Sequence, residues 1–562
     1  MIEGLLHAAL RFHEAGNLME AGRLYSDILR ANPAHFEALH RLALIHFQTG
    51  RFGDAERLFA AAIKVNPQSP EAFYGRGCAL QSLLRYEEAL ASFARALAIR
   101  PDYVEARNNR GVTLLAMKRF AEALACFGGL EVANDYAKAL ILNNRAAALL
   151  GLKRFKEALA YCEKSLALAP ELVIAWSTYA ATLVALGRYQ EALAGYDRAL
   201  RLKPDFAEAL NHRASALREL KRLEEALASY DRALQLKPDF ADAFNNRAML
   251  RLLLGRYRDG WLDHEWRWGA ENIITERSKI NAQAWQGEDL TRRRIAVYSE
   301  QGIGDIIQFA RYLPLLARRG AEVTFFVPQN LIRLLRPLAS RIKLAGSIDD
   351  REPFDFQCAL MSLPLWFGTE VSSIPGEVPY LTAENDLVAR WRKKIAGRGV
   401  KVGIAWQGAP AGAIDQGRSI PLAEFVPLSR LSGVRLISLQ KTHGLDQLAG
   451  LPAHTNIETF GDEFDAGPDA FVDTAAIMRT LDLIITSDTS IAHLAGALGR
   501  PTWVALKYVP DWRWLLDRED SPWYPTLRLF RQETPGDWKL VFAEIAQELR
   551  SLACRESAAP SP

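Results

Sequence analysis

The chain has 562 residues, of which 49% are hydrophobic and 24% are charged, and its formal net charge is +3. This length predicts several domain-sized units, and the composition is that of an ordinary soluble globular protein. The near-neutral charge balance, with no long basic run, gives no electrostatic basis for binding nucleic acid, so we expect no nucleic-acid partner.

The start of the chain and its cysteines indicate the compartment. The first sixteen residues, MIEGLLHAALRFHEAG, lack a basic segment before a long apolar core, so we expect no signal peptide. No stretch approaches the ~20 apolar residues of a membrane span. The five cysteines are scattered and form no C-x-x-C pair, which disfavours a disulfide framework or a zinc site. We therefore expect a cytoplasmic protein with no metal.

An internal repeat governs the first half of the chain. The segments ALASFARALAIRPDY (89–103), ALAGYDRALRLKPDF (192–206) and ALASYDRALQLKPDF (226–240) are clear copies, and prolines recur 34 residues apart. This period is that of the tetratricopeptide repeat, or TPR, a pair of helices that buries its faces only by stacking on its neighbours. We predict an α-solenoid over 1–272, a right-handed superhelix of seven complete repeats and a truncated eighth at about 239–272.

One repeat position forms a polar column on the first helix of successive repeats. The column consists of Asn109, Asn144, Thr178, His212 and Asn246. TPR helices present this position to the concave groove, and O-linked N-acetylglucosamine transferases carry a similar asparagine ladder there. Amide side chains can hydrogen-bond a peptide backbone whatever its sequence, which predicts an acceptor-protein groove. The alternative is a polar face in contact with solvent.

The end of the repeats is rich in aromatic residues, and a different pattern follows. Trp261, Trp266 and Trp268 lie in YRDGWLDHEWRWG (257–269), where we expect them to pack the last repeat onto the next domain. From about 292, short β-branched runs alternate with amphipathic helices. Eight strands are expected, at 292–300, 321–328, 341–346, 354–361, 401–408, 434–440, 481–487 and 502–507. We therefore predict two doubly wound, Rossmann-like domains, at 273–385 and 386–554, followed by a disordered tail at 555–562.

The first motif, SEQGIGDIIQFARYLPLLA (299–317), joins a strand to a helix through a glycine turn. Gly302 and Gly304 let a ligand approach the backbone, and the helix N-terminus favours an anion. Asp305 has two interpretations. It stabilises the first turn of the helix, or it is a carboxylate that accepts a proton from an attacking hydroxyl.

The second motif is SDTSIAHLAGALGRPTWVAL (487–506). Asp488, Thr489 and Ser490 follow a strand and are expected to cap a short helix, whose exposed N–H groups and hydroxyls would hold a diphosphate. His493 lies one turn further on. A lone helical histidine is commonly structural, but this one is beside the expected diphosphate site. The motif lacks the Gly-Lys-Ser/Thr of a P-loop, which disfavours an NTPase.

The third motif combines KVGIAWQGAP (401–410) with DQGRSIPL (415–422). Trp406, Gln407 and Gly408 end a strand at the same expected edge, and Arg418 supplies a cation that can bind phosphate through two N–H groups. Another strand end places Gln440 and Lys441 at this edge, near a bound base or phosphate.

These motifs resemble the glycosyltransferase family that includes the bacterial ADP-heptose:lipopolysaccharide heptosyltransferases. The resemblance covers about 290–550 and rests on the Gly-x-Gly-Asp turn and the Asp-Thr-Ser-x-x-His-Leu-x-x-x-x-Gly-x-Pro run. It implies a GT-B fold and metal-independent, inverting transfer from a nucleotide sugar, which is a substrate rather than a cofactor. Asp305 would then be the base, Asp488, Thr489, Ser490 and His493 the donor-phosphate segment, and Arg418 a phosphate contact.

The segment YVPDWRWLLDREDSPWYPTLRLFRQ (508–532) departs from the heptosyltransferases. It resembles a segment of bacterial TPR-linked glycosyltransferases, including flagellin-modifying enzymes. The resemblance implies sugar transfer to Ser or Thr of a protein docked on the repeats, a flagellin being one such acceptor. Two alternatives stay open: a transferase acting on a surface polysaccharide or lipid-linked glycan, and a non-catalytic scaffold whose second half senses a nucleotide sugar.

Overall fold

The computed structural model describes residues 2–269, 280–348, 353–409 and 417–558. The contacts divide the chain into two compact units, Met1–Leu220 and Lys221–Pro562. The boundary that we predicted near 272 is therefore not where the units separate. The last three helices of the repeats belong to the second unit, and the rings of Tyr257 and Trp261 in the last of them pack against Trp512 of the α/β part.

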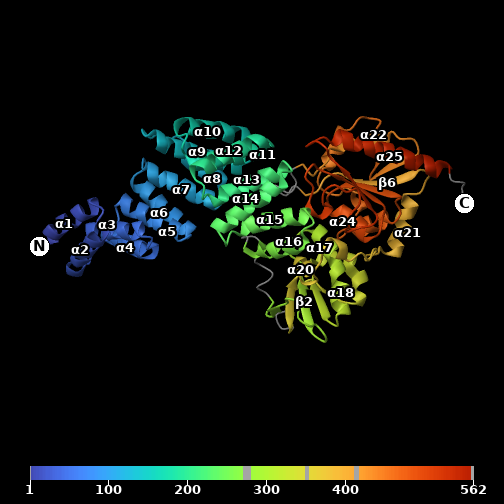
Figure 1. Cartoon of the computed structure of the whole chain (residues 1–562), viewed down its shortest axis with the longest axis horizontal. Coiled ribbons are helices and arrows are strands. Elements are labelled where there is room, and N and C mark those ends of the chain that lie inside the picture. The colour runs from blue at the N-terminus through green and yellow to red at the C-terminus, as the bar shows by residue number, and fades with distance from the viewer. Residues whose placement is uncertain (1, 270–279, 349–352, 410–416, 559–562) are drawn as a thin grey trace. The chain divides into compact units, whose positions relative to one another are not determined.

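Helices in antiparallel pairs form the first unit and continue into the second (Figure 1). The first unit contains α1 (Ile2–Glu14), α2 (Leu18–Ala31), α3 (Phe36–Gln48), α4 (Phe52–Val65), α5 (Pro70–Ser82), α6 (Tyr86–Ile99), α7 (Val104–Ala116), α8 (Phe120–Phe127), α9 (Asp135–Gly151), α10 (Phe155–Leu168), α11 (Val173–Ala185), α12 (Tyr189–Leu202) and α13 (Ala207–Glu219). The second unit begins with α14 (Leu223–Leu236), α15 (Ala241–Leu253) and α16 (Tyr257–His264). These sixteen helices are the eight predicted pairs, with a short final helix.

Small residues let the paired helices approach closely. Ala180 and Ala192 are fully buried against Tyr196, which is 1% exposed. The turn between the helices of a pair needs a left-handed residue, which Gly187 supplies with φ +75°. Lys153 and Lys221 adopt the same conformation in other repeats. The repeat geometry therefore imposes this turn even where the residue is not glycine.

The α/β part of the second unit contains two parallel sheets. The first has the order β1-β5-β2-β3-β4 and the second β11-β10-β9-β6-β7-β8. The first sheet consists of β1 (Gln283–Ala284), β2 (Arg294–Tyr298), β3 (Glu322–Phe326), β4 (Lys343–Ala345) and β5 (Phe356–Ala359). The second consists of β6 (Val400–Ala405), β7 (Val434–Ser438), β8 (Ile457–Glu458), β9 (Leu483–Ser487), β10 (Thr502–Leu506) and β11 (Leu527–Arg531).

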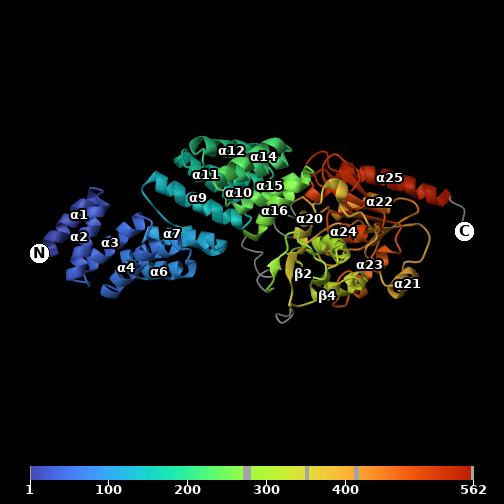
Figure 2. The same cartoon turned by 60° about the horizontal axis from the view of Figure 1, so that its bottom comes forward.

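Helices connect the strands of each sheet, and Figure 2 shows them around both sheets. The first sheet is accompanied by α17 (Ile303–Phe309), α18 (Leu313–Arg318), α19 (Ile332–Leu335) and α20 (Leu363–Trp366), and the second by α21 (Asn385–Lys394), α22 (Val426–Ser429), α23 (Val472–Met478), α24 (Ser490–Ala497) and α25 (Trp538–Ala558). The predicted disordered tail was wrong at its start, because α25 continues to Ala558. Residues 559–562 lie outside the described residues.

The aromatic segment after the repeats packs largely as predicted. Trp261 is 2% exposed, donates a hydrogen bond from Nε1 to the carbonyl oxygen of Thr369 (3.2 Å), and meets the ring of Trp512 edge-on at 5.2 Å. Trp266 differs, because it is 40% exposed and stacks on Phe244 of α15 at 4.1 Å. Trp261 is thus one contact that fixes the last repeat to the α/β part.

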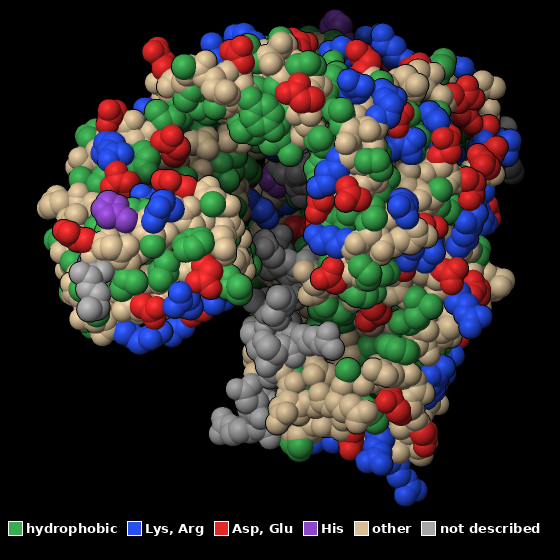
Figure 3. Space-filling model, turned by 60° about the vertical axis from the view of Figure 1, so that its left-hand side comes forward, with side chains coloured by type: hydrophobic (Ala, Val, Ile, Leu, Met, Phe, Trp, Pro, Cys, Tyr) green, Lys and Arg blue, Asp and Glu red, His purple; other side chains and the backbone are tan. Residues whose placement is uncertain are grey.

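The surface is mixed in charge. On the face shown in Figure 3, Lys and Arg side chains are interspersed with Asp and Glu, and no broad area of one sign appears. Among the helices of the described residues, none combines the length and the apolar character needed to cross a membrane.

Candidate functional site

The carboxyl edge of the second sheet has a topological switch point between β6 and β9. These strands pair in parallel, while β7 and β8 extend the sheet on one side and β10 and β11 on the other. In open α/β sheets, ligands bind in the crevice where the strand order reverses. The residues that follow β6 and β9, among them Gly408 and Asp488, are therefore placed at the position typical of a ligand site.

Gly408, Arg418 and Thr489 meet at this switch point, although they are far apart in sequence. A Cβ atom on Gly408 would lie 2.7 Å from Nη2 of Arg418 and 3.3 Å from Cγ2 of Thr489. A side chain at position 408 would displace the guanidinium of Arg418, a residue that is half-buried. The second and third sequence motifs thus converge.

Thr489 occupies the N-cap position of α24, as predicted, but its side chain does not cap the helix. Its hydroxyl lies 3.3 Å from the hydroxyl of Thr486 instead. Ser487, two residues before Thr489, is fully buried, and its Oγ has no hydrogen-bond partner among the described residues. Buried hydroxyls ordinarily have a partner, so Ser487 is an exception at the end of β9.

Asp488 carries an unfavourable charge in this crevice. Burial, followed by the neighbouring Asp511 carboxylate, raises its pKa to about 6, although the Arg513 and Arg418 guanidiniums oppose the shift. The carboxylate is therefore ionised at neutral pH but takes up a proton readily. An anion bound beside it would favour the protonated form.

His493 lies one turn into α24, close to the arginines. Its Nδ1 is 3.1 Å from the hydroxyl of Tyr524, and its ring stacks on Trp514 at 5.6 Å. Burial, followed by the charges of Arg513, Arg311 and Arg418, lowers the pKa of His493 well below its usual value. The imidazole is neutral, so the positive charge of the site comes from the arginines.

The glycine turn of the first motif packs directly on α24. Helix α17 contacts α24, and a Cβ on Gly304 would lie 3.0 Å from Cδ2 of His493 and 3.6 Å from Cα of Ser490. A larger residue at Gly304 would therefore press on the imidazole. The first motif joins the other two around the start of α24.

Asp305 makes two contacts with the protein. Its Oδ2 accepts a hydrogen bond from the backbone N–H of Gly302 (3.0 Å), and its Oδ1 forms an ion pair with Nη2 of Arg513. Burial raises its pKa, and Arg513 is the main opposing influence. A fifth of the side chain remains exposed. The contact with Gly302 is the one expected of an acid in a first helical turn, whereas the exposed part agrees with the alternative interpretation.

Arg513 is a buried residue that sequence reasoning missed. It is 8% exposed and donates to Gln308 Oε1 (2.6 Å) and Asp511 Oδ1 (2.8 Å) in addition to Asp305. The available signal was its position in the segment 508–532, where alternating Trp, Asp and Arg residues depart from the heptosyltransferase pattern. This segment therefore supplies the cation that faces Asp305.

Four other predicted donor-binding side chains are engaged with the protein itself. Trp406 is fully buried and donates from Nε1 to the carbonyl oxygen of Gly444 (3.1 Å). The Gln440 amide accepts from the N–H groups of Trp406 and Gln407 and donates to the carbonyl oxygen of Gln407 (2.6 Å). Gln407 Oε1 accepts from Gln447 (2.9 Å), and Lys441 binds the carbonyl oxygen of Phe464. These side chains hold the loops, and a direct contact with a donor stays a prediction.

The polar column of the repeats is present but partly engaged in contacts. Asn109 Nδ2 donates to Tyr74 Oη (3.2 Å), Asn144 Nδ2 donates to Asn108 Oδ1 (3.1 Å), and Thr178 Oγ1 donates to its own helix. His212 is exposed and lies 6.2 Å from the ring of Tyr196. Asn246 belongs to the second unit. Peptide binding by this column stays a prediction.

Known families match the repeats. Models described as "Tetratricopeptide repeat" match residues 6–73, 40–104, 74–127 and 180–241, and a further model of that description matches 133–172. The amino-terminal part of the chain is thus a tetratricopeptide-repeat array, of the kind that indicates a protein-interaction scaffold.

One curated relative matches a larger part of the chain. Protein FlbA of Caulobacter vibrioides is 27% identical over 325 residues, which cover 54% of each protein. The chain therefore spans about half the length of this relative. Among solved structures, a tetratricopeptide repeat protein from Parabacteroides merdae is 17% identical, with a TM-score of 0.39 over 44% of this chain and 98% of that one. YrrB, a TPR protein with an unusual peptide-binding site, is 22% identical, with a TM-score of 0.26 over 33% and 95%.

Proposed function

We propose that the chain is a glycosyltransferase of the GT-B type, which moves a sugar from a nucleotide-sugar donor to a Ser or Thr hydroxyl of a protein bound by the repeats. The observation that carries the proposal is the convergence of three motifs at the start of α24. There Gly304 faces His493 and Gly408 faces Arg418. Two parallel sheets with a glycine-lined crevice are the arrangement that such a reaction uses.

The crevice offers groups that suit a diphosphate. Arg418 can bind phosphate oxygens through two N–H groups, and the start of α24 contributes the positive end of a helix dipole. Lys507 follows β10 at the same edge and is a second candidate cation, as is Lys441. In this proposal these groups offset the negative charge that develops on the leaving diphosphate.

Asp305 is the proposed base. The acceptor oxygen attacks the anomeric carbon, the bond between that carbon and the diphosphate oxygen breaks, and its electron pair leaves with the diphosphate. The hydroxyl proton passes to Asp305. Arg513 supports this role, because its charge opposes the rise in the pKa of Asp305 that burial causes.

A specific observation favours one other function. Both contacts of Asp305, with Gly302 and Arg513, would also serve a purely structural carboxylate. In that case the second unit would bind a nucleotide sugar without turnover, and the chain would act as a scaffold. A transferase that acts on a surface polysaccharide or lipid-linked glycan differs from the main proposal only in its acceptor.

The proposal is tested by comparing intact protein masses in cells with and without the chain. A protein-directed transferase predicts one polypeptide that loses a fixed sugar mass, and a strain carrying Asp305→Asn should show the same loss. If no polypeptide changes while a polysaccharide or lipid-linked glycan does, the acceptor assignment is wrong. If neither changes, the scaffold function is favoured.

The acceptor groove has its own test. Replacing Asn109 and Asn144 by alanine should raise the KM for a protein acceptor by about thirtyfold, because two backbone hydrogen bonds of ~1 kcal/mol each are lost. Donor hydrolysis in the absence of acceptor should not change. An unchanged KM for the acceptor would show that the polar column does not bind the acceptor protein.

A further inference from the structure

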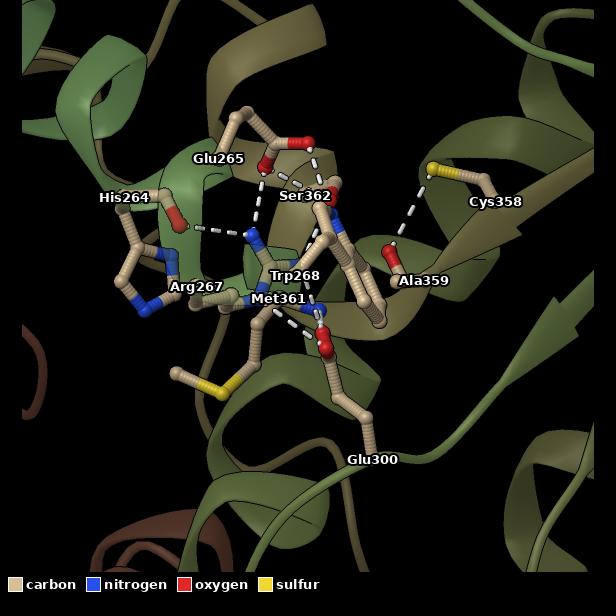
Figure 4. Close-up of polar contacts among 9 residues, drawn as sticks. All are labelled: His264, Glu265, Arg267, Trp268, Glu300, Cys358, Ala359, Met361 and Ser362. Carbon is tan, nitrogen blue, oxygen red and sulfur yellow. Dashed lines mark hydrogen bonds and ion pairs between the residues drawn. The ribbon is translucent and has the colours of Figure 1, made fainter. Parts of the chain in front are cut away.

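The segment that ends the repeats inserts one arginine into the α/β part. Arg267 lies in the 3-10 turn η1 (Glu265–Gly269) directly after α16, and it is only 1% exposed. Figure 4 shows its guanidinium surrounded by residues from the first sheet, including Glu300 and Ser362. A buried arginine is costly unless all its donors are satisfied, so its contacts define its role.

Every N–H group of this guanidinium has an acceptor. Nε and Nη2 bind the two carboxylate oxygens of Glu300 at 3.0 and 2.8 Å, and Nη2 also donates to Ser362 Oγ at 2.7 Å. Nη1 donates to Glu265 Oε1 at 2.7 Å and to the carbonyl oxygen of His264 at 3.1 Å. All the N–H groups of Arg267 are thus hydrogen-bonded. Its strongest contact is the fork, the two parallel hydrogen bonds from the guanidinium to the Glu300 carboxylate.

Arg267 occupies the switch point of the first sheet. Strands β2 and β5 are adjacent, with β3 and β4 on the far side of β2, so the strand order reverses between them. Glu300 follows β2, while Met361 and Ser362 follow β5. The cavity left beside the arginine measures about 80 Å³. Ligand pockets usually have roughly 300–1,000 Å³. The crevice is therefore filled by the protein rather than left for a ligand.

Glu300 is at one end of the turn that carries Asp305. Gly302, the N-cap of α17, and Gly304, in the first turn of α17, lie between these two acids. Glu300 is held by Arg267 and by the backbone N–H of Met361 (3.2 Å), and Asp305 is held by Arg513. The two ends of the turn are thus fixed by two arginines from distant parts of the chain.

We propose that Arg267 is a positioning residue: its fork with Glu300 fixes the turn at 300–302 before α17 and thereby the place of Asp305 relative to α24. This inference rests on the proposed function, in which Asp305 accepts a proton. A displacement of about 1 Å at a reacting group can cost roughly 10²-fold in rate. The end of the repeat array would therefore set the geometry of the reacting carboxylate without touching a substrate.

The test replaces both buried charges at once, in the full-length chain, by R267M/E300M. An apolar pair of similar size avoids leaving one charge unpaired, so folding should be retained. We expect kcat to fall by at least about tenfold while the donor KM stays within about threefold, because binding groups at α24 are untouched. The control R435M/E458M removes a similar fork, at 2.7 and 2.8 Å, between β7 and β8. This control should leave kcat unchanged.

Hydrogen exchange separates this inference from the proposed function, since it needs no turnover. Amides of 302–307 should exchange at least about tenfold faster in R267M/E300M than in the wild type or the control. Unchanged exchange and unchanged kcat would overturn the positioning role, whereas a wild type that transfers no sugar but shows the exchange difference would overturn only the proposed function. If the double variant does not fold, E300Q replaces it in the test, because the Gln side chain keeps the size of Glu and one acceptor oxygen. A tenfold lower kcat at unchanged donor KM supports the role, and an unchanged kcat rejects it.

Discussion

The two parallel sheets present the same topological feature and fill it differently. At the switch point of the first sheet, Arg267 enters from the end of the repeats and uses all its donors, to Glu300 and Ser362 and to Glu265 and the carbonyl oxygen of His264. At the switch point of the second sheet, Gly408, Arg418 and Thr489 meet, and Arg418 is half-buried. The first crevice is closed by the protein itself, and the second is lined by groups suited to a ligand.

The difference between the two crevices indicates that the first sheet serves to fix geometry and the second to bind a ligand. The arginine that fills the first crevice fixes a turn and joins the repeats to the α/β part. The arginine at the second crevice lies at a strand end, where an anion can reach it. We therefore expect substitutions at the first edge to act on geometry and substitutions at the second edge to act on ligand affinity.

The largest effect, on kcat, is expected from a substitution of Asp305. Asp305→Asn should lower kcat by about 10²–10⁴-fold, because the amide cannot accept the acceptor's proton, while donor affinity should change little. Turnover with a nucleotide sugar and binding by calorimetry measure the two quantities. Asp289→Asn, at an exposed turn before β2, is the matched control. Near-normal turnover in Asp305→Asn would show that Asp305 is not the base. Its role would then be structural, through its contacts with Gly302 and Arg513.

A smaller effect is expected for the cation of the second edge. Arg418→Met should weaken binding of a nucleoside diphosphate by about 10–100-fold, because a charge-assisted contact worth roughly 1.5–3 kcal/mol is lost. Arg398→Met removes the same charge from an exposed site before β6, at the opposite edge of this sheet, and should leave affinity unchanged. Equal losses in both variants would mean that only the overall charge matters.

The next effect concerns the pH dependence of stability. The pKa of Asp488 is about 6 in the folded protein, above its usual 3.8, so the folded state holds a proton that the unfolded state has lost between these values. Stability from this group is therefore greatest below pH ~4 and is lost as pH rises to ~6. Asp488→Asn should be more stable than the wild type at pH 7.5, by at most about 3 kcal/mol, and the gain should shrink by pH 4.5.

Denaturant unfolding at the two pH values checks this sign. A stability gain that is equal at both pH values would contradict the raised pKa of Asp488. The same variant should flatten the pH dependence of nucleoside-diphosphate binding, because a bound anion favours the protonated carboxyl.

The smallest effect is expected from metal removal. The sequence has no D-x-D pair of the metal-dependent kind, so sugar transfer should survive a chelator. Turnover measured before and after EDTA treatment and dialysis checks this expectation. A loss that Mg²⁺ or Mn²⁺ restores would contradict it.

The repeats and most strands could be predicted from sequence because their signals are local and periodic. The 34-residue spacing fixed the helix pairs, and the β-branched runs gave eight of the strands. Strand β11 was missed because Arg528 and Arg531 interrupt its apolar residues. Strands β1 and β8 have only two residues each, too few for a periodic pattern.

The site could be predicted only in part, since its decisive contacts join distant segments. The strand-end motifs pointed to Gly304, Gly408, Thr489 and His493, which do meet. The ion pair of Asp305 with Arg513 spans 208 residues, and that of Arg267 with Glu300 spans 33. Charged pairs of this kind leave no periodic trace in one sequence. Trp406 and Gln440 were assigned to a donor because a strand end was visible, whereas their burial and bonding were not.

We propose that the second edge, and not the first, binds the diphosphate of a nucleotide sugar. Hydrogen exchange of the full-length chain with saturating ADP, CDP, GDP or UDP tests it most directly. At least one of these should slow exchange at 406–409 and 487–493, while 299–300 and 359–362 keep their rates. Protection confined to the first edge, or no protection by any of the four, would contradict the account.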